Sequence, residues 1–321
     1  MDSNPKASAK ELIVFTHNDL DMAGCVMNIE FKFPETKKKY FFTNYQNIDE
    51  QVDAIIQHAN TRPGLITHVI VADVSFSDNK PALRALYANF TVIHIDHHMY
   101  PAGFWDEFPN MRVVWDDEKS ASLLCNEFFG NAGQNQNLDN LTKIIDIYDV
   151  WQDHHPFFGL AQDLNDYFWR VGAEKFLTSV LSEERMFKLP LDFKEVVEGI
   201  HKENDEAIRR IESEGLIQRS GELTIIYTAE KFNRVMLREM HVFEQTFVVG
   251  ISNFGIVRIR VNRAAQIPPG ILDSIRERLT GNINHGHAHA FTYKSSEETP
   301  DGILREAQKV ATVISEEMEG L

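Results

Sequence analysis

The stretch Ile93-His94-Ile95-Asp96-His97-His98 joins a predicted strand to a group of metal-binding residue types. Residues 91–95 are mostly apolar or β-branched, which is typical of a buried strand, and a carboxylate and two imidazoles follow them. The end of a buried strand is rigid enough to hold such side chains in a defined geometry. Imidazole suits ions of the zinc, manganese and iron type, but polar residues also cap strands. The triplet alone therefore leaves both interpretations open.

The same residue types follow earlier predicted strands. The expected elements are strands at 11–15, 40–43, 68–72, 91–95 and 112–115, and helices at 22–33, 49–59 and 81–88. This alternation predicts an α/β fold with a doubly wound, mainly parallel sheet, in which sites form at the carboxyl ends of the strands. His17, Asp19 and Asp21 follow the first strand, and Asp73 follows the third. The pattern thus predicts one site at several strand ends.

The remainder of the chain predicts a helical region, a connector and a second domain. Helices are expected over 121–181, and Asp146 and Asp149 lie three residues apart on one helix face. The expected domains are a catalytic domain at 9–185, a helical connector at 186–220 and a smaller α/β domain at 221–321. In the last of these, strands are expected at 223–227, 246–252 and 256–261, and helices at 268–279 and 302–318.

Composition restricts the classes of partner. The formal net charge of −16 disfavours a protein that tracks long nucleic acid, which needs a basic stripe. Carboxylates can instead bind divalent cations. The longest apolar runs are too short to cross a membrane, the first ten residues do not resemble a signal peptide, and the two cysteines lie in apolar helical patterns. We therefore expect a cytoplasmic protein without a disulfide framework.

Strand-end residues of these types suit a centre of two metal ions about 3.5–4 Å apart, which needs a carboxylate that reaches both. Asp73 suits that role because its strand is expected to lie between the strands that carry the other groups. Such a centre activates water near neutral pH. His98 would then be free to contact the phosphate and to protonate the leaving oxygen. The structural alternative is that Asp19 and Asp21 cap the following helix.

The set of motifs resembles the DHH phosphoesterase superfamily. The segments that carry the resemblance are His17-Asn18-Asp19-Leu20-Asp21, Val71-Ala72-Asp73, Ile95-Asp96-His97-His98, a helical aspartate before Trp151, and the later loop Gly286-His287-Ala288-His289-Ala290. This superfamily includes RecJ-type exonucleases, nano-RNases, cyclic-nucleotide and cyclic-dinucleotide phosphodiesterases and family II pyrophosphatases. The last loop is similar to the substrate-binding loop of the DHH-associated domain.

The resemblance implies two Mn²⁺ ions, with Mg²⁺ or Co²⁺ as alternatives. The implied ligands are His17 and Asp19 for one ion, Asp21, His97 and Asp149 for the other, and Asp73 as the bridge. Asp146 is the alternative to Asp149. Asp96 would orient the histidines, and His98 would take part in catalysis. The implied substrate-binding residues of the second domain are Arg260, Arg263, Gly286 and His287.

Two departures from the family pattern concern the substrate. Met22 separates Asp21 from Ala23-Gly24, where the family has glycine directly after the second aspartate, and His285 replaces one of two glycines in the later loop. We expect a metal-dependent phosphoesterase that acts on short oligonucleotides or small nucleotides. A RecJ-like single-strand exonuclease, a pyrophosphatase and a non-catalytic nucleotide-binding regulator are the alternatives. No membrane and no long duplex DNA are expected as partners, and assembly into a homo-oligomer is left open.

Overall fold

The chain folds into two units, Met1–Val197 and Glu198–Leu321. The computed structural model describes residues 11–182, 186–227, 236, 239–240, 242–252, 255–262, 265, 267–268, 270–280, 290–296 and 299–319. The boundary between the units falls inside helix α8 (Phe193–Ser213). The connector that we expected at 186–220 thus contains this helix, and it also contains the short strand β6 (Ile217–Ser220).

The first unit is built on a sheet of five parallel strands. The strands are β1 (Leu12–His17), β2 (Lys38–Thr43), β3 (His68–Ala72), β4 (Thr91–Asp96) and β5 (Arg112–Trp115). Their order is β2-β1-β3-β4-β5, and every neighbouring pair is parallel. The predicted doubly wound α/β sheet is therefore confirmed. In this order the connections reverse direction at β1 and β3, which is where such sheets place their sites.

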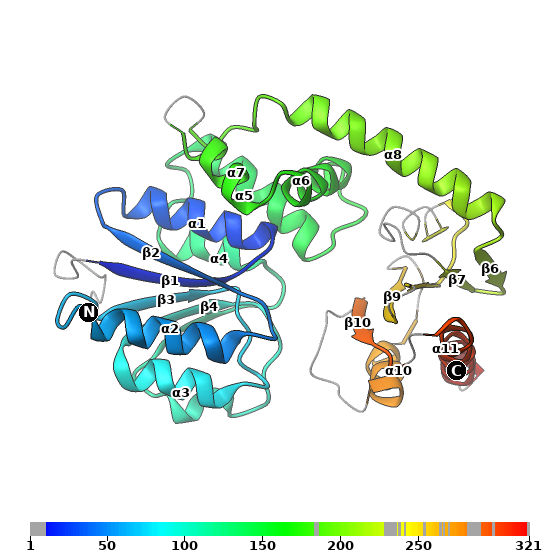
Figure 1. Ribbon diagram of the computed structural model, residues 1–321, viewed down its shortest axis with the longest axis horizontal. Coiled ribbons are helices and arrows are strands. Elements are labelled where there is room, and N and C mark those ends of the chain that lie inside the picture. Colours follow the sequence, from blue (N-terminus) through cyan, green and yellow to red (C-terminus); the bar gives the residue numbers. More distant parts are fainter. Residues whose placement is uncertain are drawn as a thin grey trace. The chain divides into compact units, whose positions relative to one another are not determined.

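Helices cover both faces of this sheet (Figure 1). They are α1 (Leu20–Lys32), α2 (Ile48–Asn60), α3 (Lys80–Asn89) and α4 (Ala121–Phe128). Successive side chains of β1 point to opposite faces, as they must in a strand. Ile13 and Phe15 pack in the core with α2 and α3. Leu12 and Val14 pack in the core with α1 and α4. An apolar strand buried on both faces is characteristic of parallel sheets.

A second helical layer packs on the outer side of α1. Its helices are α5 (Gln136–Asp149), α6 (Phe158–Val171) and α7 (Ala173–Val180). Val26 of α1, Ile145 of α5 and Phe168 of α6 are buried in one cluster. A short 3₁₀ helix, η1 (Phe104–Glu107), lies between β4 and β5. The helical region that we expected over 121–181 is thus divided into α4, α5, α6 and α7, and α5 ends at Asp149.

In the residues that the structure describes, the second unit contains a mixed sheet with two helices packed on one face. Its strands β6, β7 (Leu223–Tyr227), β8 (Phe247–Ile251), β9 (Ile256–Val261) and β10 (Ala290–Lys294) lie in the order β10-β9-β8-β7-β6. Strands β7 and β8 are parallel and the other pairs are antiparallel. Helices α10 (Ile271–Thr280) and α11 (Pro300–Glu319) pack against β9 in one core. Sequence reasoning missed β6 and β10, whose residues are largely solvent-accessible and lack a clear apolar alternation.

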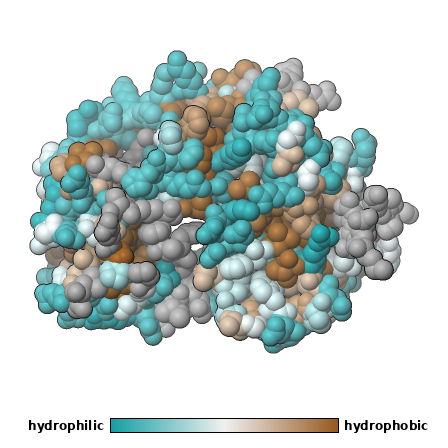
Figure 2. All heavy atoms as spheres, turned by 180° about the vertical axis from the view of Figure 1, so that it is seen from behind, coloured by the Kyte–Doolittle hydropathy of each residue, from teal (hydrophilic) through white to brown (hydrophobic). Residues whose placement is uncertain are grey.

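Hydrophilic residues dominate the surface on the face shown in Figure 2, where hydrophobic residues form separate patches. This agrees with a charged-residue content of 25%. Within the part of the chain that the structure describes, every helix is too short or too polar to cross a bilayer.

Candidate metal centre

The carboxyl ends of three neighbouring strands bring the predicted ligands together. His17 ends β1, Asp73 directly follows β3, and Asp96 ends β4 with His97 after it. Strand β3 pairs with β1 on one side and with β4 on the other. Strand β3, which Asp73 follows, therefore lies between the two strands that carry the other predicted ligand groups at this edge.

His17, Asp19 and Asp73 form the first group of candidate ligands. One donor atom from each residue lies within 4.8 Å of the others. Nδ1 of His17 is 2.8 Å from Oδ2 of Asp19, while Oδ1 of Asp19 accepts a hydrogen bond from the backbone N–H of Met22 at 3.1 Å and caps α1. Burial opposes ionisation of Asp19, but the neighbouring His17 lowers its pKa to about 2. Asp19 thus caps the helix with one oxygen and faces the site with the other.

Asp21, His97 and Asp149 form the second group. Their donor atoms also lie within 4.8 Å of one another. Nε2 of His97 is 3.4 Å from Oδ2 of Asp149, the last residue of α5. This group joins the first turn of α1, the end of β4 and the end of α5, so residues 21, 97 and 149 meet only in the folded chain.

Asp73 faces both groups with different oxygen atoms. Its Oδ1 lies 3.5 Å from Nε2 of His97, and its Oδ2 lies 3.9 Å from Nδ1 of His17. The residue is 2% exposed. The backbone has a φ of 58°, in the left-handed region that aspartate enters more readily than most residues, and its N–H donates to the carbonyl of Ile95 at 3.0 Å. This turn directs the carboxylate between the two histidines.

The electrostatics of these carboxylates suit a divalent cation. Burial, together with repulsion from neighbouring carboxylates, raises the pKa of Asp21 to about 7 and the pKa values of Asp73 and Asp149 well above the usual range. Oδ2 of Asp73 and Oδ2 of Asp149 are buried and have no hydrogen-bond partner in the described part of the chain. Carboxyl groups in such a position ionise only beside a counter-charge, and carboxylates with imidazoles are ligands of Mn²⁺-type ions. The residues present therefore fit a divalent metal.

The N-terminus of α4 holds Asp21 in place. The backbone N–H groups of Ala121 and Ser122 donate to its two carboxylate oxygens at 2.8 and 3.0 Å. These groups are among the N–H groups that a helix start leaves without an intrahelical partner. Sequence reasoning did not find this contact, although Ser120, which caps α4, marks the start of a helix.

Asp146 contacts the residue that precedes α4 and belongs to neither group of candidate ligands. Its Oδ1 accepts a hydrogen bond from the backbone N–H of Ser120 at 2.8 Å, and its Oδ2 accepts one from Gln152 at 3.2 Å. Asp149, in contrast, lies beside His97 and Asp21. Of these two aspartates of α5, Asp149 is thus the one that lies among the candidate ligands.

Asp96 lies behind the two histidines and is 0% exposed. Its Oδ1 accepts hydrogen bonds from the backbone N–H of His97 at 2.9 Å and from Nδ1 of His98 at 2.7 Å. Its Oδ2 accepts one from the hydroxyl of Tyr100 at 2.5 Å. Burial opposes the charge, but His98 lowers the pKa of Asp96. Both oxygens of Asp96 are thus engaged, and of the two imidazole rings it is that of His98 that contacts this carboxylate.

His98 stands at the edge of the site between two aromatic residues. Its Nε2 lies 2.7 Å from the hydroxyl oxygen of Tyr45, and its carbonyl accepts a hydrogen bond from Nε1 of Trp115 at 2.6 Å. Burial opposes protonation, but Asp96 raises the pKa of His98. Tyr45 and Trp115 were not among the residues expected from the sequence, because neither belongs to a recognisable motif.

Of the predicted substrate-binding residues, the structure describes only Arg260, while Arg263, Gly286 and His287 lie outside the described residues. Arg258 and Arg260 line a cavity of about 230 Å³ formed by β9 and β10. Ala290, which follows the Gly286-His287 loop in the chain, pairs with Arg260 in the antiparallel register.

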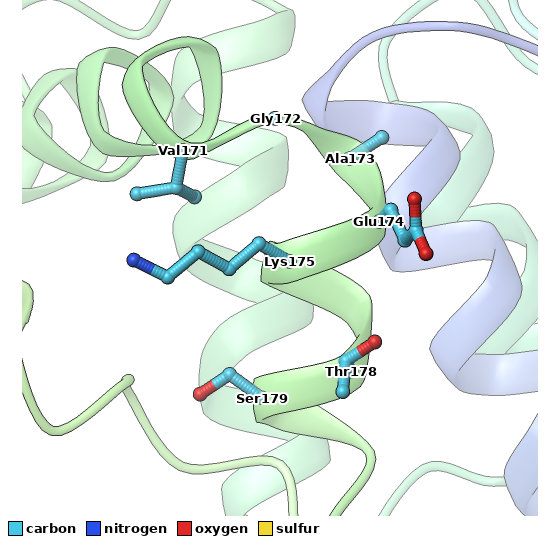
Figure 3. A pocket seen from close by; sticks show the side chains of 7 residues that line it. All are labelled: Val171, Gly172, Ala173, Glu174, Lys175, Thr178 and Ser179. Atoms are coloured by element: carbon cyan, nitrogen blue, oxygen red, sulfur yellow. The ribbon is translucent and has the colours of Figure 1, made fainter.

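A larger cavity of about 580 Å³ lies where α6 meets α7, and none of the residues that line it belongs to the two groups of candidate ligands. Figure 3 shows Lys175 and Glu174 on opposite sides of α7, pointing apart. Lys175 forms an ion pair with Asp192 at 3.2 Å. Since the charged residues that line this cavity do not converge, it does not compete with the strand ends as the candidate site.

No protein-family model and no curated protein sequence matches the chain. Solved structures do. RecJ of Thermus thermophilus, solved with Mn²⁺, is 16% identical with a TM-score of 0.59 over 95% of this chain and 52% of that one. This chain therefore spans about half the length of that RecJ. It has the fold of the DHH proteins.

Two further structures of this fold match almost end to end. PggH of Vibrio cholerae, described as a pGpG-specific phosphodiesterase, is 15% identical with a TM-score of 0.50 over 95% of this chain and 99% of that one. CDC45 of Entamoeba histolytica is 9% identical with a TM-score of 0.52 over 94% of this chain and 95% of that one. At these identities the similarity confirms the DHH fold expected from the motifs.

Proposed function

We propose that this protein is a metal-dependent phosphoesterase that hydrolyses phosphodiester bonds in short oligonucleotides or small nucleotides. The observation that carries the proposal is the position of Asp73, whose two oxygens lie 3.5 Å from Nε2 of His97 and 3.9 Å from Nδ1 of His17. A buried carboxylate between two separate ligand groups is the arrangement that a two-metal centre requires.

The proposed ligands of one ion are His17 and Asp19, those of the other are Asp21, His97 and Asp149, and Asp73 is the bridge. Carboxylates and imidazoles without a thiolate favour Mn²⁺, with Mg²⁺ or Co²⁺ as alternatives. When bound, two such ions activate water and neutralise the charge that develops on a phosphoryl group.

Residues around the centre have separate tasks. Asp96 fixes the orientation of His98 through the 2.7 Å contact with Nδ1, which leaves Nε2 turned away from Asp96. From there His98 can bind a phosphate oxygen and give a proton to the leaving oxygen. The backbone N–H groups of Ala121 and Ser122 hold the Asp21 carboxylate, so that this ligand does not depend on the metal for its position.

We assign substrate binding in the second unit to Arg260, Arg263, Gly286 and His287. Arg260 and its neighbour Arg258 line the cavity of about 230 Å³ on β9 and β10, and guanidinium groups bind phosphate with two parallel hydrogen bonds. The register places Arg260 opposite Ala290, three residues after His287 in the chain. This supports a role for the loop and the arginine in one binding surface.

A short substrate accords with the charge of the protein. A net charge of −16 opposes the binding of long polyanions, which depends on counterion release at a basic groove. PggH, which has the same fold, is described as specific for pGpG. Long duplex DNA is therefore not an expected partner, and a RecJ-like exonuclease on long single strands is the second candidate among the enzymes.

A hydrolysis panel tests the proposal. The purified protein would be incubated with Mn²⁺, Mg²⁺ or a chelator and with a dinucleotide, a cyclic dinucleotide, phosphoadenosine phosphate, a strand of about 20 nucleotides, long enough to need a basic groove, and pyrophosphate. We expect cleavage of the short nucleotides that is strongest with Mn²⁺ and absent in the chelator. Preference for the long strand would favour the exonuclease. Binding of nucleotides without any hydrolysis would favour a non-catalytic regulator.

A further inference from the structure

Tyr45 lies in a well-braced loop between β2 and α2. Oδ1 of Asn47 accepts hydrogen bonds from the backbone N–H of Asn44 and from the hydroxyl of Thr43, both at 2.8 Å. Oδ1 of Asn44 accepts one from the backbone N–H of Gln46 at 2.9 Å. Tyr45 is 50% exposed. The loop thus presents an accessible phenol from a fixed backbone position.

The phenol of Tyr45 contacts two histidines of the candidate centre. Its hydroxyl oxygen is 2.7 Å from Nε2 of His98. Its ring centroid is 5.1 Å from that of His17, with the two planes tilted by 35°. Tyr45 therefore reaches from a proposed ligand of one ion to the imidazole that we expect to meet the phosphate.

The chemistry of this position suits a neutral hydrogen-bond donor. A tyrosine hydroxyl is uncharged near neutral pH and can both donate and accept a hydrogen bond. A hydroxyl rotates about its C–O bond and can donate to one partner or another. An anionic phosphate beside several carboxylates needs donors that carry no negative charge, and hydrogen bonds to charged groups are the stronger ones.

We propose that the hydroxyl group of Tyr45 donates a hydrogen bond to a phosphate oxygen of the substrate and thereby uncovers Nε2 of His98 for the same phosphate group. The inference rests on the proposed phosphoesterase function. It adds a substrate-contacting residue from the loop between β2 and α2, a part of the chain that carries none of the sequence motifs.

The test compares Tyr45→Phe with the wild-type protein and with Tyr87→Phe. The phenylalanine at position 45 retains the ring beside His17 and removes only the hydroxyl. Tyr87 lies on α3, where its hydroxyl accepts a hydrogen bond from the backbone of Asn110 at 3.3 Å. Tyr87→Phe therefore controls for the removal of a tyrosine hydroxyl outside the candidate centre. Four quantities would be measured: kcat/KM on bis(p-nitrophenyl) phosphate and on a dinucleotide, the Kd of inorganic phosphate for the Mn²⁺-loaded protein, the Kd of Mn²⁺, and the melting temperature.

For Tyr45→Phe we expect kcat/KM on both substrates and the affinity for phosphate to fall by about ten- to a hundredfold, the scale of one hydrogen bond to a charged group. The affinity for Mn²⁺ and the melting temperature should match those of Tyr87→Phe. Unchanged turnover and phosphate affinity would overturn the proposal, and so would a parallel loss of Mn²⁺ affinity, which would show that the hydroxyl only supports the ligands.

The phosphate titration separates the two proposals. If the wild-type protein binds phosphate but hydrolyses nothing, the proposed function is wrong, and the effect of Tyr45→Phe on phosphate affinity still decides the role of Tyr45. Wild-type protein that neither hydrolyses diesters nor binds phosphate would overturn both.

Discussion

Gly24 of α1 faces Ser122 of α4 so closely that a methyl group on Gly24 would lie 2.4 Å from the Cβ atom of Ser122 and 2.9 Å from its hydroxyl oxygen. The same Ser122 donates its backbone N–H to Asp21 at 3.0 Å. The small residue on α1 thus permits the helix approach that holds a proposed metal ligand.

Gly24→Ala should therefore destabilise the protein by about 1–3 kcal/mol, the usual cost of overpacking, and should weaken Mn²⁺ binding through Asp21. Gly159→Ala is the matched control, because Gly159 also lies in a helix, α6, and a methyl group there would meet nothing within 4 Å. The control should be neutral or more stable by up to about 1 kcal/mol. Equal free energies of unfolding in urea for the two variants would contradict this account.

Asp73→Asn should abolish turnover while the fold survives. Asparagine has nearly the same volume and also tolerates the left-handed backbone that Asp73 adopts with a φ of 58°, but it lacks the charge that both ions require. We expect kcat/KM to fall by more than about a hundredfold, the upper range for residues that merely support ligands. Asp117→Asn, at an exposed position, is the control. If steady-state kinetics gave similar values for the two variants, the bridging role would be misassigned.

Asp149→Asn and Asp146→Asn should have different effects, because we propose Asp149 as a metal ligand and Asp146 only as a hydrogen-bond acceptor for the backbone of Ser120. An amide oxygen at position 146 can still accept the hydrogen bond that Asp146 receives from the backbone of Ser120 at 2.8 Å, so Mn²⁺ affinity should stay within about threefold, or less than one ordinary hydrogen bond. At position 149 the lost charge should lower Mn²⁺ affinity by about tenfold or more. Calorimetric titration with Mn²⁺ measures both, and the reverse order would assign the ligand to Asp146.

A divalent cation should stabilise the folded protein. The mutual repulsion of the carboxylates Asp21, Asp73 and Asp149 is relieved by a bound cation, and a ligand at a hundred times its Kd adds about 2.7 kcal/mol to the stability. Mn²⁺ should raise the melting temperature in scanning calorimetry, and a chelator should reverse the shift. The same addition to Asp73→Asn should have a smaller effect; an equal shift would place the cation elsewhere.

Arg260→Ala should impair real nucleotides more than minimal diesters. Binding energy from remote parts of a substrate helps to position the reacting phosphate, so kcat/KM on a dinucleotide should fall by about ten- to a hundredfold, the scale of a charge-assisted hydrogen bond. Activity on bis(p-nitrophenyl) phosphate should remain. Arg84→Ala, which removes a surface ion pair with Glu107, controls for the lost charge. An equal loss of kcat/KM on both substrates would show that Arg260 acts in the chemical step or in folding.

The sequence by itself determined the parallel sheet and predicted which residues follow its strand ends, because both depend on local patterns. Apolar runs that alternate with helical periodicity predict parallel strands, and parallel strands bring their carboxyl ends to one edge. His17, Asp73 and His97 could therefore be expected together before the structure was known, and the strand order β1-β3-β4 confirms that β3, which Asp73 follows, is the central one of these three strands.

Only the tertiary structure decided which groups support the ligands. Ser122 reaches Asp21 across 101 residues of sequence, and Tyr45 reaches His98 across 53. Asp146 and Asp149 share one helix and one residue type, and only their different neighbours, the backbone of Ser120 and the ring of His97, distinguish them. Such contacts depend on how helices and loops pack over long distances in the chain, and hydrophobic periodicity carries no information about them.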